Sequence, residues 1–306
     1  KIPLQGKGVF YLRTVKDALD VYGYRKHMNR AIVYGGGPIG IKAAYALLQK
    51  GIPVSIVVSS GQILSRVLDT KAAAIFQTIF EQHGGRFYCN SEMKDIVNRK
   101  GCKGVIINRG EEITGDVLIV GKGVTPDMVV LKDSGIMTHE GVLVDERMET
   151  NIQGVYAAGD VAEADLTGRK GKAVVSLWPV GASQGRIAGA NMAGMKKFYE
   201  GSINSNSIEY FGLQAISMGI LQGVNLEERT FEENGVYRRF FFENRRLVGA
   251  VLVGNVEGAG ILMEAIRREL PIQDQLTRLA LDPFPTLSTA NSERGTDRPV
   301  KMEVLF

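Results

Sequence analysis

The sequence has few residues that carry metal or redox chemistry. Its 306 residues include two cysteines, Cys89 and Cys102, and three histidines, His27, His83 and His139. The cysteines are too far apart for a C-x-x-C motif, and two thiols cannot form a disulfide framework. Each histidine is isolated in the sequence. We therefore assign no metal ligand and no catalytic side chain, and we interpret both cysteines as plain thiols in a reducing compartment.

Long hydrophobic runs are also absent. No stretch reaches the roughly 18 consecutive apolar residues of a membrane span, and the start of the sequence carries no signal segment. The formal net charge is +4, but basic and acidic residues are interleaved, as on an ordinary solvated surface. We therefore expect no membrane, no nucleic-acid partner and a cytoplasmic location.

Glycine, by contrast, is abundant, and one group of glycines forms a motif. The buried-strand pattern Ala31–Tyr34 is followed by Gly35, Gly37 and Gly40 in the spacing G-x-G-x-x-G, and a helical pattern continues to Lys50. In dinucleotide-binding folds the first glycine permits the turn, the second lets the main chain approach a pyrophosphate, and the third lets helix and strand pack closely. This order predicts nucleotide binding by Gly35, Gly37, Pro38, Ile39 and Gly40.

The choice between NADH and NADPH is left open by the sequence. An acidic residue about 20 positions beyond the glycines, at the end of the second strand, would bind the ribose hydroxyls of NADH. Val58 occupies that place and is followed by Ser59 and Ser60, with Arg66 nearby. No carboxylate repels a 2′-phosphate there, and the two hydroxyls could donate to one. A serine at this point is equally an ordinary turn residue.

The remaining pattern alternates strands with helices, which predicts a mostly parallel sheet with helices on both faces. Strands are expected at 54–58, 86–88, 93–98, 104–108 and 155–158, with another buried strand inside Asp116–Asp127, and helices are expected at 69–83, from Trp178 onward and at 259–270. The segment from Gly235 to Gly254 alternates, turns at Glu243–Arg246 and alternates again, which indicates a β-hairpin.

Four segments in this order resemble one family. They are "GVFYLRTVKDA" from Gly8, "VYGGGPIGIKAAYAL" from Val33, "DVLIVGKGVTPD" from Asp116 and "TNIQGVYAAGDVAE" from Thr150. Their order and spacing resemble the pyridine nucleotide-disulfide oxidoreductases, in particular the branch of NADH oxidases, rubredoxin reductases and nitrite reductase flavin subunits. The resemblance covers Gly8 to Gly194 and extends more loosely to the hairpin segment.

The resemblance implies a fold, cofactors and further binding residues. It implies two Rossmann-like domains, for FAD and NAD(P)H, and a smaller C-terminal α+β domain. Gly123 falls in the motif that contacts the nucleotide. Gly159 and Asp160 would contact the flavin's phosphate and ribityl chain, and the helix that begins at Trp178 and Pro179 would point toward the flavin ring.

The sequence departs from the family pattern in two places. Many members carry glutamate two residues after the last glycine, near the nicotinamide, and this chain has Lys42. The family also binds the adenosine half of FAD through an N-terminal strand–glycine–helix unit that the sequence lacks, so we expect the FAD domain to be incomplete in this chain.

These observations define the expected organisation. We expect a lead-in and part of the FAD domain at 1–28, the NAD(P)-binding domain at 29–112, the second FAD segment at 113–200, the C-terminal domain at 201–281 and a tail at 282–306. The expected function is an FAD-dependent NAD(P)H oxidoreductase that passes hydride to flavin and electrons to an unidentified acceptor. A homodimer through the C-terminal domain is expected.

Two alternative functions come from other classes. One is a truncated, non-catalytic nucleotide-binding or interaction subunit that a partner chain completes. The other is an RNA-binding module built on "YRRFFFENRR", Tyr237 to Arg246, in which aromatic rings would stack on bases.

Overall fold

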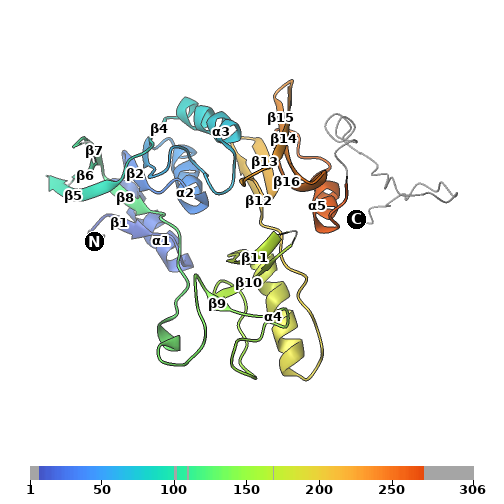
Figure 1. Ribbon diagram of the computed structural model, residues 1–306. Coiled ribbons are helices and arrows are strands. Elements are labelled where there is room, and N and C mark those ends of the chain that lie inside the picture. Colours follow the sequence, from blue (N-terminus) through green and yellow to red (C-terminus); the bar gives the residue numbers. More distant parts are fainter. Residues whose placement is uncertain (1–6, 100–101, 109, 168, 272–306) are drawn as a thin grey trace. The chain divides into compact units, whose positions relative to one another are not determined.

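The computed structural model describes residues 7–271 except 100–101, 109 and 168 (Figure 1). The chain divides into two compact units. The first contains Lys1–Val124 together with Glu209–Leu213, and the second contains Thr125–Ile208 and Gln214–Phe306. The tail expected at 282–306 lies outside the described residues.

A five-stranded parallel sheet forms the centre of the first unit. Its strands, in spatial order, are β1 (Val9–Tyr11), β8 (Val117–Val120), β2 (Ala31–Tyr34), β3 (Val54–Val57) and β4 (Gly85–Tyr88). Every residue of β2 and β8 is buried. Strands that read as continuous apolar runs are typical of parallel sheets that are covered on both faces. The predicted parallel sheet is therefore confirmed.

Local capping signals mark the ends of helices in the first unit. They are α1 (Val15–Tyr24), the short 3₁₀-helix η1 (Arg25–His27), α2 (Pro38–Leu48) and α3 (Thr70–Gln82). The carboxylate of Asp69 accepts from the amides of Lys71 and Ala72, which caps the start of α3. Gly51, after α2, takes a positive φ of 73°, as is common where a helix ends.

One face of the parallel sheet is covered by an antiparallel sheet, although helices were expected on both faces; the strands predicted at 93–98 and 104–108 are part of it. Strands β5 (Met93–Arg99), β6 (Cys102–Ile107) and β7 (Glu112–Gly115) form an antiparallel sheet. Ile32 of β2 packs in one core with Val105 and Ile113 of this sheet, whereas the neighbouring Val33 lies against α2 at Gly40. Because successive strand residues point to opposite faces, the prediction of helices on both faces is wrong for this face.

Strand β8 lies in a different sheet from the one expected. From the sequence, β8 was expected in the second FAD segment, residues 113–200, and β1 in the part of the FAD domain at residues 1–28. Both strands instead pair within the parallel sheet of the first unit, β8 with β1 on one side and with β2 on the other. The structural boundary therefore falls after Val124. Buried parallel strands have the same sequence pattern in either domain, so the pattern could not choose the sheet.

The first part of the second unit is a small sheet beside a long helix. Its elements are η2 (Val129–Leu131), β9 (Val142–Leu143), β10 (Ala162–Leu166), β11 (Arg169–Val174) and α4 (Trp178–Met192). The strand expected at 155–158 is wrong. Only Tyr156 makes a β-bridge there, to Glu149, because a strand needs a neighbouring strand along its length and the described chain offers this segment a single partner.

The second part of the second unit is a five-stranded antiparallel sheet packed against one helix. The strands are β12 (Ser205–Tyr210), β13 (Leu213–Gly219), β14 (Glu227–Glu233), β15 (Val236–Glu243) and β16 (Arg246–Val253), and the helix is α5 (Ala259–Arg267). Strands β15 and β16 are the predicted hairpin. Tyr237 and Phe240–Phe242 are at most 2% exposed, so their rings cannot stack on bases and the RNA-binding alternative is rejected.

Tyr210 and Phe211 build an aromatic cluster within the first unit. The Tyr210 ring packs edge-on against Phe80 of α3, with 5.4 Å between ring centroids, and Phe211 stacks on His83 at 3.9 Å. Tyr210 is 3% exposed, and its burial raises the pKa of its hydroxyl to about 12. The cluster therefore extends the apolar packing of α2 and α3 with residues that come from far along the chain.

Candidate cofactor-binding site

The glycine turn after β2 is closed by backbone contacts that exclude side chains. Gly35 has a φ of 130°, and a Cβ on it would lie 2.2 Å from the carbonyl oxygen of Gly121. A Cβ on Gly40 would lie 2.0 Å from the carbonyl oxygen of Gly35. These distances are far below van der Waals contact, so both positions require glycine for packing. The predicted roles of the first and third glycines in the turn agree with this geometry.

Gly37 differs from its neighbours because it faces open space. A Cβ on Gly37 would have no atom within 4 Å, and its φ and ψ of −80° and 178° are accessible to any residue. Gly37 is the N-cap of α2, so the amides of Ile39 and Gly40 in the first turn have no intrahelical acceptor. Free amides and the positive end of the helix dipole beside an open space fit a pyrophosphate.

The end of β3 lies beside this turn. Val58 is 1% exposed, and a Cβ on Gly36 would lie 2.6 Å from Val58 Cγ1. Ser60 Oγ donates to the carbonyl of Gln62 at 2.8 Å, so its hydroxyl proton is already engaged. Ser59 is exposed, and its Oγ accepts a hydrogen bond from Lys122 Nζ at 3.2 Å. Of the two hydroxyls considered from the sequence, Ser59 alone keeps its proton available.

Gly123 and Lys42 complete the predicted residues of the first unit. Gly123 follows β8 with a φ of 85° and open space above its Cα, so it lies at the same carboxyl edge of the sheet as the glycine turn. Lys42 is exposed on α2, and its Nζ lies 5.3 Å from the ring centroid of Tyr45 and 5.5 Å from that of Tyr210. Lys42 therefore packs as a cation over aromatic rings.

The second group of predicted residues lies together in the second unit. Gly159 has a φ of 81°, and a Cβ built on Gly181 of α4 would lie 3.3 Å from the Cα of Gly159. The amide of Gly159 donates to Oε1 of Gln184, which is 1% exposed, at 2.8 Å. The loop that carries Gly159 is therefore held directly against the first turns of α4.

Asp160 is presented to solvent at this point. The amide of Ala162 donates to the carbonyl of Gly159 at 2.9 Å, which places Asp160 inside a tight turn and not at a helix cap. Within the described part of the chain, its carboxylate makes no hydrogen bond or ion pair. The Gly159 amide is occupied by Gln184, so a ligand here would meet the Asp160 side chain and the backbone that follows it.

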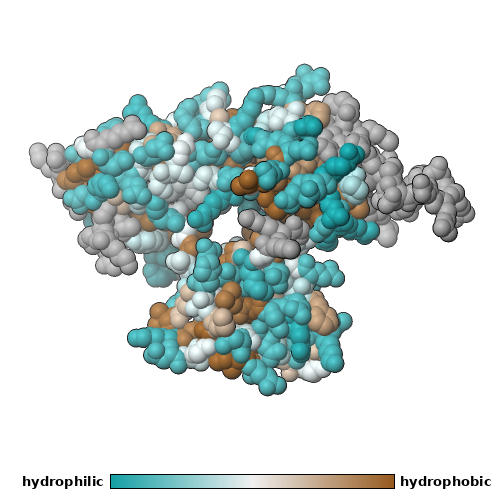
Figure 2. All heavy atoms as spheres, viewed as in Figure 1, coloured by the Kyte–Doolittle hydropathy of each residue, from teal (hydrophilic) through white to brown (hydrophobic). Residues whose placement is uncertain are grey.

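Helix α4 begins where the sequence predicted. Leu177 is its N-cap and provides no side-chain hydrogen bond, and Pro179 lies in its first turn. Trp178 is 88% exposed. In Figure 2, brown surface gathers over the part of the chain that contains α4 and β9–β11, and its exposed apolar residues include Val129, Val130, Trp178, Met192, Met195 and Phe198.

A buried glutamate holds the loop before β9. Glu163 is 4% exposed, and its carboxylate accepts from the amides of Glu140 and Gly141 and from His139 Nδ1 at 2.8, 2.9 and 3.0 Å. Burial opposes ionisation of Glu163, but these donors outweigh it and hold the pKa below its ordinary value. The hydrogen bond to Glu163 raises the pKa of His139.

A Glu163→Gln variant should loosen this loop in a pH-dependent way. The lowered pKa of Glu163 means that its contribution is present above about pH 4.3 and is lost as pH falls through the folded value. The raised pKa of His139 means that its contribution is present below about pH 6.5 and is lost as pH rises through the folded value. At pH 6 we expect amide exchange at Glu140 and Gly141 to be faster by about tenfold, the effect of losing one hydrogen bond to a charged group.

Hydrogen exchange followed by mass spectrometry over residues 138–144 measures this effect. The matched control is Glu140→Gln, which removes an exposed carboxylate from the same loop and should leave the exchange rates unchanged. Equal exchange in Glu163→Gln and wild type at pH 6 would contradict the role assigned to Glu163.

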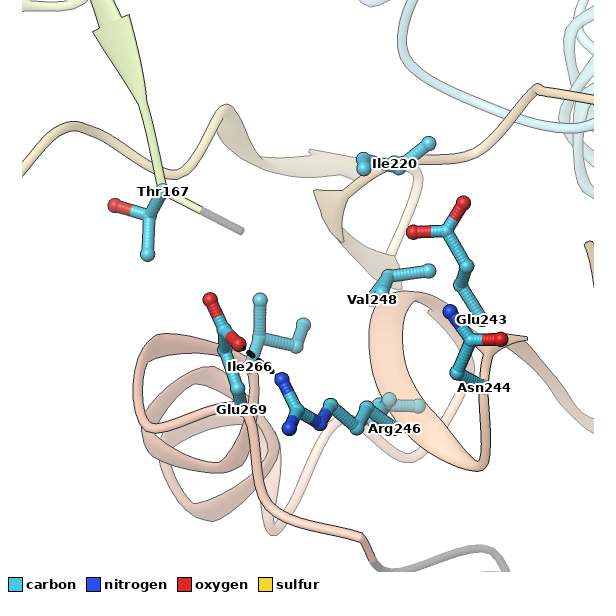
Figure 3. Close-up of a pocket in the computed structure, with 9 residues that line it drawn as sticks. Thr167, Ile220, Glu243, Asn244, Arg246, Val248, Ile266 and Glu269 are labelled. Atoms are coloured by element: carbon cyan, nitrogen blue, oxygen red, sulfur yellow. Dashed lines mark hydrogen bonds and ion pairs between the residues drawn. The ribbon is translucent and has the colours of Figure 1, made fainter. Parts of the chain in front are cut away.

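A separate pocket lies in the C-terminal part of the second unit. It has a volume of about 290 Å³ and is lined in part by Glu243, Arg246, Ile266 and Glu269 (Figure 3). Arg246 is already paired with Glu269, and Glu243 adds a second carboxylate. A pocket with this charge balance does not favour a phosphate, so we do not assign a nucleotide to it.

One of the two cysteines agrees with the expectation drawn from the sequence. Burial raises the pKa of the Cys89 thiol, which lowers the fraction of reactive thiolate and agrees with a plain thiol. Cys102 lies in β6. Among the helices of the described ranges, none combines the length and the apolar character that crossing a membrane demands.

Several residues of these sites were not predicted from the sequence. Lys122, Gly121 and Tyr34 line the carboxyl edge of the first sheet, and Gln184 and Gly181 hold the Gly159 loop. The run Gly121-Lys122-Gly123 directly after a buried strand is a signal that could have singled out Lys122. Gln184 has no comparable signal, because an amide in a helix is normally a surface residue.

The fold and the glycine turn define a dinucleotide-binding protein of the Rossmann type with an added antiparallel domain. Residues 1–185 match the family model described as pyridine nucleotide-disulphide oxidoreductase. Residues 205–270 match the one described as the rubredoxin NAD+ reductase C-terminal domain. The first match covers more than half of the chain, so the chain belongs to the pyridine nucleotide-disulphide oxidoreductase family, and the resemblance found in the sequence is confirmed.

Individual relatives agree with this assignment. The chain is 28% identical over 290 residues to nitrite reductase [NAD(P)H] of Bacillus subtilis, which covers 92% of this chain and 35% of the relative. It is 31% identical over 280 residues to the epsilon subunit of NADH-dependent phenylglyoxylate dehydrogenase of Aromatoleum evansii, covering 89% of this chain and 66% of the relative. The chain thus spans about one third to two thirds of the length of these relatives.

Solved structures share the fold. An NADH-bound water-forming NADH oxidase from Lactobacillus brevis matches with a TM-score of 0.84 at 20% identity, over 90% of this chain and 66% of that one. An NAD-dependent persulfide reductase from A. fulgidus matches with a TM-score of 0.83 at 24% identity, over 94% and 57%. These likenesses confirm the predicted fold class, a Rossmann-like α/β core with a C-terminal α+β domain.

Proposed function

We propose that this chain carries the NAD(P)H site and part of the FAD site of a flavoprotein oxidoreductase. FAD bound to the protein would supply the redox chemistry, accepting hydride from the nicotinamide and giving electrons to a separate acceptor. The family to which the chain belongs supports the class of reaction. The observation that carries the proposal is the open space at Gly37, beside the free amides that begin α2.

The first unit binds and orients the nicotinamide nucleotide. Gly35 and Gly40 hold strand and helix so close together that the main chain is the only surface presented at the turn. The amides of Ile39 and Gly40 then donate to the pyrophosphate, and the helix dipole stabilises its charge by roughly 0.3–1 kcal/mol. A side chain at position 37 would occupy the space that the pyrophosphate needs. This explains why position 37 is a glycine although packing does not require one there.

The second unit contributes residues that fit part of FAD. The exposed carboxylate of Asp160 is an acceptor suited to the hydroxyls of a ribityl chain, and Gln184 fixes the loop that carries it. The N-terminus of α4, one turn from Gly181, supplies positive dipole character. The flavin itself supplies the redox chemistry when bound, so this chain needs no acid–base side chain for the transfer.

The acceptor differs among the relatives. They include the nitrite reductase and phenylglyoxylate dehydrogenase subunit described above and an NADH-rubredoxin oxidoreductase of Clostridium acetobutylicum that is 28% identical over 260 residues. The names of these relatives include both a small molecule, nitrite, and a redox protein, rubredoxin. A homodimer through the C-terminal domain and a cytoplasmic location stay predictions.

A non-catalytic subunit that a partner chain completes is the second candidate. The exposed apolar side chains around α4 favour it, because surfaces of this kind are usually covered by other polypeptide. Both candidates include nucleotide binding, and they differ in whether the protein reduces a flavin.

Anaerobic stopped-flow mixing distinguishes the two candidates. The full-length protein is mixed with NADH and separately with NADPH, and the visible absorbance of its flavin is followed. We expect rapid bleaching with at least one of the two nucleotides. A protein that holds flavin but is bleached by neither, or that holds no flavin at all, would contradict the oxidoreductase and favour the non-catalytic subunit.

A further inference from the structure

Lys122 and Ser59 meet at the carboxyl edge of the parallel sheet in the first unit. Lys122 follows β8 and Ser59 follows β3, and β2 lies between these two strands. Lys122 Nζ donates to Ser59 Oγ at 3.2 Å and lies 4.6 Å from the centroid of the Tyr34 ring. Tyr34 is the last residue of β2, directly before Gly35, so the ammonium lies over the strand that leads into the glycine turn.

The contact leaves both partners with hydrogen-bond donors to spare. The ammonium has three donors, and one of them is used on Ser59. Because Ser59 accepts in this bond, its own hydroxyl proton is free to donate. Both side chains are exposed, and across the described residues Lys122 enters no ion pair with a carboxylate. A cation and a hydroxyl donor therefore stand side by side and are open to a ligand.

The carboxylate that usually accepts hydrogen bonds from the ribose hydroxyls of NADH is missing beside this pair. In NAD-binding Rossmann folds a carboxylate at the end of the second strand accepts from the ribose hydroxyls, and a nearby cation accommodates a 2′-phosphate instead. Val58 holds that place and packs against the glycine turn at Gly36. The position therefore offers nothing to the 2′-hydroxyl of NADH and does not repel a phosphate.

Tyr34 explains why the lysine is held in this place. The Tyr34 ring is 8% exposed and so presents a fixed face to the ammonium, which is a cation–π contact. Ser59 provides the second anchor. A long side chain that is already held near its binding position loses less conformational freedom when the ligand arrives.

We propose that Lys122 and Ser59 bind the 2′-phosphate of the adenosine ribose, so that the first unit binds NADPH in preference to NADH. The inference rests on the proposed function, because it assumes that the nucleotide lies on the glycine turn. A 2′-phosphate carries between one and two negative charges and three acceptor oxygens near neutral pH. The ammonium and the Ser59 hydroxyl supply the charge and the donors that it requires.

Isothermal titration calorimetry with NADPH and NADH tests this inference. For wild type we expect NADPH to bind about tenfold more tightly than NADH, the effect of one charge-assisted hydrogen bond. Lys122→Met should weaken the affinity for NADPH by about tenfold and change the affinity for NADH by less than twofold. Ser59→Asp should weaken the affinity for NADPH at least as much, because it places a negative charge beside the 2′-phosphate. The matched control is Lys50→Met, which changes an exposed lysine in the turn after α2 and should alter the affinity for neither nucleotide.

The possible outcomes separate the inference from the proposed function. Equal affinities of wild type for NADPH and NADH, or a Lys122→Met variant that weakens both nucleotides alike, would overturn the inference and leave the proposed function standing. A Lys122→Met variant that weakens the affinity for both nucleotides alike would indicate that Lys122 binds the pyrophosphate, which the two nucleotides share. Binding of neither nucleotide by wild type would overturn the proposed function and the inference together. Circular dichroism melts of the variants establish that each is folded.

Discussion

A Gly37→Asp variant should stay folded and lose NAD(P)H binding almost completely. The backbone angles at Gly37 suit any residue, and a Cβ there meets no atom within 4 Å. Aspartate is also a favourable N-cap residue, because its carboxylate accepts from the amides of the first helical turn. Those amides, of Ile39 and Gly40, are the ones that the pyrophosphate is proposed to use. The variant therefore fills the space, engages the donors and repels the phosphate charge.

We expect the dissociation constant for NADPH and for NADH to rise by at least about 100-fold, equivalent to about 2.7 kcal/mol. Flavin content should be unchanged, and the melting temperature should stay within about 4 °C of wild type. Calorimetric titration with each nucleotide measures the dissociation constants, and a thermal melt measures the melting temperature. Wild-type nucleotide affinity in a folded Gly37→Asp protein would remove the glycine turn from the nucleotide site.

A Gly40→Ala variant should lose most of the stability of the first unit. The added Cβ would lie 2.0 Å from the carbonyl oxygen of Gly35 and 3.0 Å from its carbonyl carbon. Neither atom can move away freely, because Gly35 is itself confined by Gly121. The methyl group must therefore separate α2 from β2. We expect the free energy of unfolding to fall by about 3 kcal/mol or more, as for overpacking at a rigid site.

Urea unfolding followed by circular dichroism measures this loss. Gly23→Ala is the matched control, since Gly23 lies inside α1 of the same unit and a Cβ there meets nothing within 4 Å. Alanine is favoured over glycine in a helix by up to about 1 kcal/mol, so this control should be slightly stabilised. A Gly40→Ala protein as stable as wild type would show that strand and helix are not held by the glycine contact.

The two substitutions separate binding from folding at neighbouring glycines. Gly37 and Gly40 lie three residues apart in one motif, in which the second glycine is expected to allow approach of a pyrophosphate and the third to allow close packing of helix and strand. The structure assigns space for a ligand to the first and close backbone packing to the second. Loss of nucleotide binding in both variants is expected, but only Gly40→Ala should lose it through unfolding.

The elements whose signals are local could be located from the amino-acid sequence. Strand β2, the start of α3 at Asp69, the start of α4 at Trp178 and the β15–β16 hairpin were all predicted close to where they lie. Each depends on residues within a few positions of one another, such as a buried run, a capping side chain or a turn between alternating segments. The glycine turn belongs to the same class, because its three glycines are close in the chain.

The sequence patterns did not predict which segments lie beside one another in the folded chain. Strand β8 was predicted as a strand but placed in the wrong sheet, and the segment around Tyr156 was predicted as a strand although it finds a single bridge partner. The contact between Lys122 and Ser59 joins residues that are 63 positions apart. The physical reason is common to all three. Strand pairing and side-chain contacts are made with partners that local periodicity does not identify, so a pattern can predict that a strand exists without predicting what lies beside it.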